Sequence, residues 1–217
     1  MNNIATKMTP IARLAKIRAG YPFRGAILES PGSGIGVIQL RFCSFEYGID
    51  WENVIETAIA EKSRTPWLED GDVLFAARGG RHYAMSVRIP EGMHFKRGVI
   101  AAPHFYILRP SAEVLPEFLT WQLNSQPCQQ YFETGAVGSY MKNVRRATLA
   151  ELRIPLPNLG EQKKLIAAVD TLTQQHRNLQ ALQENGRRVM DAMATQLLIS
   201  ASRDGCTQPE QGPTTSE

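Results

Sequence analysis

The chain has 217 residues and a mass of 24.2 kDa, enough for one domain with a buried core and an appendage. Hydrophobic residues make up 43% of it and charged residues 21%, which excludes a wholly disordered or collagen-like chain. Its three cysteines, Cys43, Cys128 and Cys206, do not suit a disulfide framework or a paired-cysteine zinc module. No stretch has the apolar length of a membrane span or of a signal peptide. We therefore expect a cytoplasmic protein.

The positive charge lies in the front part of the chain. Through Pro157 there are 18 Lys and Arg against 14 Asp and Glu, and from Asn158 onward there are 6 against 7. A basic excess of this size permits nucleic-acid binding but does not require it.

The front part alternates short apolar runs with turn residues, which is typical of a sheet-containing domain. We expect Thr9 to be the N-cap of a short helix or turn over 9–17, and a partly helical acidic stretch over 50–61. The expected strands are 36–42, 73–77, 83–89, 98–102 and 105–108. An amphipathic helix follows over 116–124, extended by 126–132, and then a glycine-bearing loop over 134–143. Pro155 and Pro157 mark a boundary, because proline does not fit inside a helix.

Beyond Gly160 the sequence favours one long helix, which we expect over 158–200, with a disordered tail over 201–217. Its apolar residues recur near one face, and three of its leucines lie seven apart, as in a coiled-coil seam. Gly186 weakens this seam at the next heptad position. The face could pack within this chain or against a partner helix. The candidate interface residues are Leu165, Val169, Leu172, Leu179, Leu182, Val189, Met193 and Leu197.

Motifs for catalysis or cofactor binding are missing from the sequence. There is no phosphate-binding loop, the histidines lack metal-ligand spacing, and the glycine turn at 32–36 precedes a strand instead of following one. Asp70, Asp72, Glu161 and Lys163 could hold a divalent ion if they converged, which leaves a metal-dependent nuclease as a minor alternative. We predict a non-catalytic chain with no metal and no cofactor of its own.

Two polar and basic clusters are candidates for DNA contact. Arg78, Arg81 and His82 follow the end of an expected strand, beside two glycines. The second and denser cluster lies on the loop before the proline boundary: Ser139, Tyr140, Lys142, Asn143, Arg145 and Arg146. Arg or Lys can pair with guanine and Asn with adenine, although solvated loops have a similar composition.

Five stretches, in the same order, resemble parts of the specificity subunits of type I restriction–modification systems. Residues 152–166 (LRIPLPNLGEQKKLI) are similar to the strand, proline step and Glu-Gln-Lys helix start that end each target-recognition domain of that family. The other stretches are 19–23 (AGYPF), 36–40 (GVIQL), 68–75 (LEDGDVLF) and 116–125 (PEFLTWQLNS). The chain departs from the family at 99–103 (VIAAP), where a polar step is common, and it has room for only one recognition domain and one long helix.

The resemblance implies a half-length specificity subunit. Its fold would be an α/β (α+β) target-recognition domain over 1–157 with a mixed or antiparallel sheet, followed by one long coiled-coil-type helix. It would direct a partner DNA adenine methyltransferase, which binds S-adenosylmethionine, and a restriction subunit to double-stranded DNA. Two copies paired through the helix would read an interrupted palindrome. The alternative is a decoy or regulator that occupies the methyltransferase without reading DNA.

Overall fold

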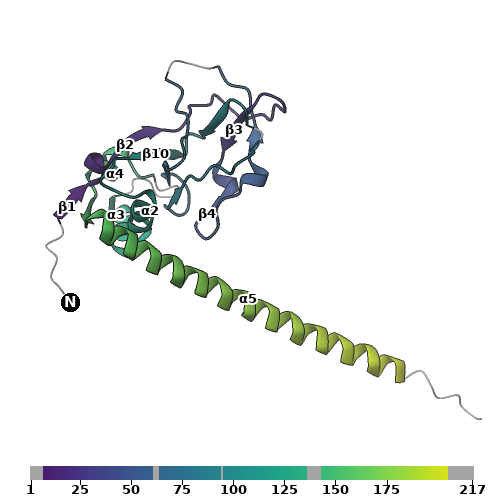
Figure 1. Ribbon diagram of the computed structural model, residues 1–217. Coiled ribbons are helices and arrows are strands. Elements are labelled where there is room, and N and C mark those ends of the chain that lie inside the picture. Colours follow the sequence, from purple (N-terminus) through teal and green to yellow (C-terminus); the bar gives the residue numbers. More distant parts are fainter. Residues whose placement is uncertain (1–6, 61–63, 94, 136–142, 205–217) are drawn as a thin grey trace, which may run out of the picture. The chain divides into compact units, whose positions relative to one another are not determined.

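The computed structural model describes residues 7–60, 64–93, 95–135 and 143–204. The chain divides into two compact units, the first ending at Ile166 and the second beginning at Ala167 (Figure 1). The strands are β1 (Lys7–Pro10), β2 (Ala15–Ala19), β3 (Ile35–Ile38), β4 (Cys43–Ser44), β5 (Gly48–Ile49), β6 (Ile55–Glu56), β7 (Val73–Ala76), β8 (Ala84–Ser86), β9 (Gly98–Ala101), β10 (Phe105–Pro110) and β11 (Arg153–Leu156). The helices are α1 (Ile11–Leu14), α2 (Pro116–Asn124), α3 (Gln126–Gly135), α4 (Arg146–Glu151) and α5 (Leu159–Asp204), with 3-10 turns at Leu40–Phe42 and Trp51–Asn53.

The centre of the first unit is a four-stranded antiparallel sheet in the order β2-β10-β7-β8. A second sheet, β6-β3-β9, combines the parallel pair β3–β9 with an antiparallel edge strand. With the long C-terminal helix, these sheets confirm the fold class that the sequence predicts.

The four-stranded sheet is buried on both faces. Val73 and Phe75 of β7 pack into the core formed with the helices, while Leu74 and Ala76 face the core shared with β3 and β9. Successive strand residues point to opposite faces, so a strand buried on both sides reads as an unbroken apolar run. This burial explains the VLFA sequence of β7.

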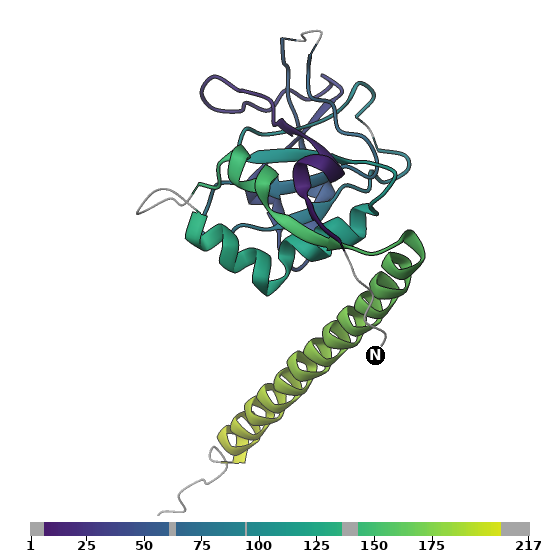
Figure 2. The same cartoon turned by 90° about the vertical axis from the view of Figure 1, so that its left-hand side faces the viewer.

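Strand β1, near the start of the first unit, pairs with β11, near its end, over a register from Lys7↔Leu156 to Pro10↔Arg153 (Figure 2). Thr9 lies in β1 and does not cap a helix, and the N-cap of α1 is Pro10 without a side-chain bond. The expected helix or turn over 9–17 is therefore wrong except for the four residues of α1. Local sequence signals favoured a helix here. They could not indicate the strand, because its partner is more than 140 residues away along the chain.

The expected strand over 36–42 also ends early, at Ile38. Ala102 N–H bonds to the Ile38 carbonyl at 2.9 Å, after which Leu40–Phe42 form a 3-10 turn. That turn leads the chain out of the sheet and into the β4–β5 hairpin. The helix predicted over 116–124 is confirmed with the same bounds.

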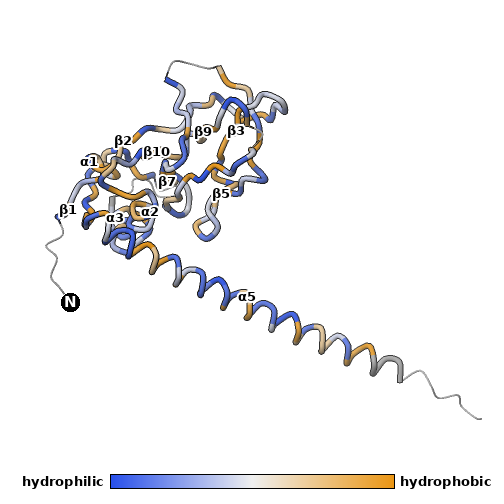
Figure 3. The backbone as a smooth tube through the Cα atoms, viewed as in Figure 1, coloured by the Kyte–Doolittle hydropathy of each residue, from blue (hydrophilic) through white to orange (hydrophobic). Residues whose placement is uncertain are grey.

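Helix α5 begins where Asn158 Oδ1 accepts the Glu161 N–H at 3.0 Å, which caps its first turn. Beyond Ile166 most of its large apolar side chains are exposed, for example Leu172 at 65%. Figure 3 shows hydrophobic positions alternating with hydrophilic ones along the helix. The helix continues to Asp204, four residues past its expected end at 200, and the rest of the expected tail, 205–217, lies outside the described residues. Over the described ranges, no helix is long and apolar enough to cross a membrane.

Candidate DNA-binding surface

The end of β7 brings the two predicted clusters together. Ala77 N–H bonds to the His104 carbonyl at 3.0 Å, and the Ala77 carbonyl accepts the Val144 N–H, also at 3.0 Å. The next residue, Arg78, forms an antiparallel bridge with Asn143. Arg78 and Asn143 are therefore neighbours, although 65 residues separate them along the chain.

Four arginines lie within three residues of this junction along the chain. Arg78, Arg81, Arg145 and Arg146 are all exposed. Arg145 is the N-cap residue of α4 and Arg146 its first residue, where a cation opposes the helix dipole and gains no stability from it. Their charge is thus available for an anion outside the chain, such as a DNA phosphate.

Asn143 differs from these arginines because it is half-buried. Its Oδ1 atom is buried and has no hydrogen-bond partner within the described ranges. A buried amide oxygen without a donor is costly, which makes a donor from a bound molecule favourable at this position.

Not every predicted residue lies on this surface. His82 is only 5% exposed, its ring stacks on Phe75, and its Nδ1 lies 3.2 Å from the Ala76 carbonyl oxygen. His82 therefore has a place in the core, and we leave it out of the proposed DNA contacts. Ser139, Tyr140 and Lys142 lie outside the described residues, so their prediction stays untested.

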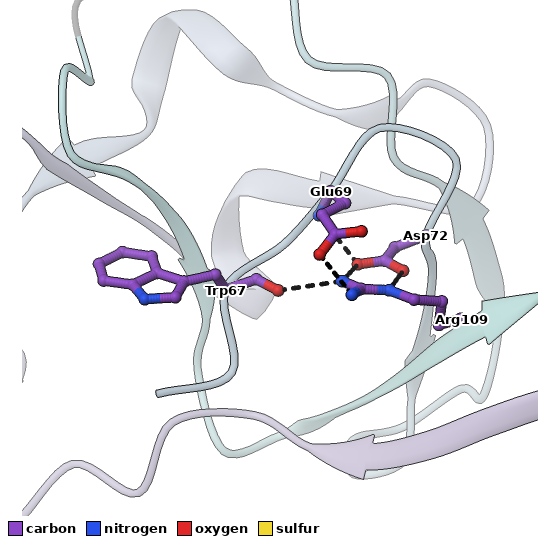
Figure 4. A network of polar contacts seen from close by, with 4 residues as sticks. All are labelled: Trp67, Glu69, Asp72 and Arg109. Atoms are coloured by element: carbon purple, nitrogen blue, oxygen red, sulfur yellow. Dashed lines mark hydrogen bonds and ion pairs between the residues drawn. The ribbon is translucent and has the colours of Figure 1, made fainter. Parts of the chain in front are cut away.

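Two of the acidic residues considered for a nuclease, Asp70 and Asp72, make structural contacts, and Figure 4 shows those of Asp72. Asp72 is 1% exposed and binds Arg109 through two hydrogen bonds of 2.8 and 2.9 Å, while Glu69 and the Trp67 carbonyl contact the same guanidinium. The hydrogen bonds that Arg109 donates to Asp72, together with the charges of both carboxylates, raise the pKa of Arg109 and keep it charged.

Asp70 in turn accepts the Ile89 N–H at 3.0 Å. Among the described residues, no group of His, Cys, Asp and Glu could hold a metal ion. The carboxylate of Asp72 is bound to Arg109, so it is not free to hold a metal ion in this arrangement.

Sequence reasoning missed the role of Gln162 in the Glu-Gln-Lys stretch. This side chain is fully buried, accepts the Leu115 N–H at 2.9 Å, and donates to the carbonyls of Glu113 and Pro157 at 3.0 and 2.9 Å. Gln162 thereby fixes the first turn of α5 to the segment that begins α2. The glutamine of the Glu-Gln-Lys stretch therefore has a structural role. In the sequence, only its position after the proline step could have indicated that role.

Sequence reasoning also missed two aromatic residues beside the arginines. The guanidinium carbon of Arg81 lies 3.8 Å from the centre of the Phe45 ring, and Tyr47 follows at the tip of the β4–β5 hairpin. No local signal links Phe45 to Arg81, because strands β5, β6 and β7 lie between them along the chain.

Comparison with known proteins agrees with this architecture. The model of the type I restriction modification DNA specificity domain family matches residues 47–185, so the chain belongs to that family. The resemblance seen in the sequence is thus confirmed. No curated protein sequence matches the chain.

Several solved structures share the fold at low sequence identity. One is the S subunit of a type I system from M. genitalium (TM-score 0.56, 20% identity, 91% of this chain and 46% of that chain). Another comes from work on complex assembly and conformational transition in the type I system (0.63, 16%, 93% and 47%). A third is the HsdS subunit from Thermoanaerobacter tengcongensis (0.54, 18%, 96% and 51%). The chain spans about half the length of each.

Proposed function

We propose that this chain is a non-catalytic specificity subunit that reads double-stranded DNA and directs a partner adenine methyltransferase to it. The observation that carries the proposal is the junction of Arg78 with Asn143, where exposed arginines surround a half-buried amide. Arginines can grip phosphates while an asparagine reads an adenine edge, which are the two contact types that a recognition domain needs. Membership of the DNA specificity family supports the same function.

The partners follow from this role. The methyltransferase would carry S-adenosylmethionine, a restriction subunit would add cleavage, and the complex would act in the cytoplasm. One of the similar structures comes from work on complex assembly of the type I system, which supports a multisubunit setting. A decoy that occupies the methyltransferase without reading DNA would share the scaffold but would not need the exposed arginines.

The exposed apolar side chains of α5 support pairing with a second copy of the chain. Leu172, Leu179 and Leu182 are each at least 60% exposed, and water contact with so many large side chains along one helix is unfavourable. Two-fold pairing would present two recognition domains to two half-sites, which makes the target interrupted and palindromic.

The grip on the DNA backbone is tested through salt dependence. Replacing Lys142, Arg145 and Arg146 with Ala should weaken binding and lower the slope of log affinity against log salt by about 0.9 for each lost phosphate contact. The assay is fluorescence anisotropy with duplex DNA, for the chain alone and together with its methyltransferase. An unchanged slope in the triple variant would place DNA elsewhere on the chain, and no binding by the parent complex would favour the decoy.

The reading of bases is tested with a matched pair of variants. Asn143→Ala should cost about 1–3 kcal/mol on the cognate duplex and little on a scrambled one, because an uncharged residue adds nothing to counterion release. Arg145→Ala should weaken both duplexes alike if it touches only phosphate. Equal losses on both duplexes for Asn143→Ala would remove this residue from the base-reading set.

A further inference from the structure

The β4–β5 hairpin presents large aromatic side chains to solvent. Its strands pair Cys43 with Ile49 and Ser44 with Gly48, and the tip is closed by a 2.9 Å bond from Tyr47 N–H to Ser44 Oγ. Phe45 is 40% exposed and Tyr47 is 78% exposed. An ordered hairpin that holds two aromatic rings in water loses burial energy, so a contact outside the chain is the natural explanation.

The hairpin is fixed to the strand that follows the first arginine cluster. Tyr83 O–H donates to the Cys43 carbonyl at 3.0 Å, and the Tyr83 ring meets the Phe45 ring edge-on with 6.5 Å between centres. Burial, followed by the nearby Cys43, raises the pKa of Tyr83 to about 12, so its phenol stays protonated and keeps this bond. These contacts hold the hairpin beside the residue that follows His82.

Phe45 also controls where the Arg81 guanidinium lies. The 3.8 Å approach to the ring centre is a close cation–π contact, which holds the flat guanidinium on the ring face. A guanidinium held in this way loses little rotamer entropy on binding and still presents N–H donors at its edge. Two such donors match the O6 and N7 acceptors of guanine.

The side chains at the tip favour bases over phosphates as the binding partner. Phe45 and Tyr47 are both exposed there, and aromatic rings pack on bases or sugars. The arginines that suit phosphate, Arg78, Arg145 and Arg146, lie at the β7 junction instead.

We propose that the β4–β5 hairpin and Arg81 form a base-reading element of their own. Phe45 is the positioning residue that holds Arg81 toward a guanine, and Tyr47 contacts the same stretch of duplex. This assignment rests on the proposed DNA-reading function and adds one guanine-specific position to the recognised sequence.

The test is selection of binding sites from a random duplex library, using the full chain alone and with its methyltransferase. Arg81→Lys keeps the charge but loses the forked donors, and Phe45→Leu removes the ring face. Each should lower the preference for guanine at one position by about 5- to 150-fold and leave the other positions unchanged. Phe45→Trp keeps the cation–π contact and should retain the preference. Tyr47→Ala should weaken binding at the neighbouring position.

Arg88→Lys is the matched control, because Arg88 lies beyond the far end of β8 in an ion pair with Glu117. It should select the same sequences as the parent chain. Identical selected sites for the parent, Arg81→Lys and Phe45→Leu would overturn the assignment while leaving the proposed function intact. If Arg81→Lys loses the preference for guanine and Phe45→Leu keeps it, Phe45 has no positioning role. No enrichment by the parent chain in either form would overturn both proposals.

Discussion

Replacing Gln162 with Ala tests how the first turn of α5 is anchored within the first unit. The substitution removes three hydrogen bonds, each of which contributes about 1 kcal/mol net. Glu113 is exposed, so water can solvate its carbonyl in the variant, whereas the Leu115 N–H at the start of α2 is part-buried and loses its acceptor. We therefore expect a loss of about 3 kcal/mol in the free energy of unfolding.

The assay is urea unfolding followed by tryptophan fluorescence. Trp51, Trp67 and Trp121 all lie in the first unit, so the signal reports on that unit. With a slope of about 2 kcal/mol per molar urea, the loss corresponds to a midpoint about 1.5 M lower. The slope itself should stay unchanged, because the substitution alters stability and not the surface exposed on unfolding.

Gln174→Ala is the matched control in the same helix. Gln174 is exposed and donates a hydrogen bond to Asn178 four residues on, so its loss should change the stability by less than about 0.5 kcal/mol. A Gln162→Ala midpoint equal to that of Gln174→Ala would refute the role of the buried amide.

Three further predictions follow from the structure. Gly20→Ala should destabilise the chain by at least about 2 kcal/mol in the same assay, because an added Cβ overlaps the Ala102 carbonyl, while Gly80→Ala, with open space around it, should be neutral. Burial, and to a smaller extent the charge of Asp50, raises the pKa of Cys43 from 9.0 to about 12. Alkylation of Cys43 at pH 8, measured by mass spectrometry of its peptide, should therefore be about 1,000-fold slower in the folded than in the unfolded chain. Equal rates would contradict this burial. Replacing Leu165, Leu172 and Leu179 of α5 with Glu should yield monomers in light scattering. A parent chain that is already monomeric, both alone and with its methyltransferase, would contradict the pairing proposal.

The parts of the fold that the sequence predicts correctly depend on local patterns. Helix α2 begins at Pro116 with an apolar face, and β7 is an apolar run after the Gly71 turn, so neighbours along the chain determine both. The pairing of β1 with β11 depends on residues far apart, and no local pattern around Thr9 indicates it.

The candidate site shows the same division. Composition indicated the arginines and Asn143, because polar and basic residues gather at turns. Their meeting at Arg78 could not be predicted, since it depends on how β7 lies against the segment before α4. His82 looked like a surface residue beside two arginines, but the strand that begins after it turns its ring onto Phe75.

The central claim is that this chain selects the DNA sequence at which a methyltransferase acts. The most direct test is to map methylated adenines in the host genome with the gene intact, deleted, and restored as the parent or the Asn143→Ala form. We predict that methylation at one interrupted sequence disappears on deletion, returns with the parent chain, and returns only partly or at altered sites with Asn143→Ala. Methylation that is unchanged by the deletion would contradict the claim.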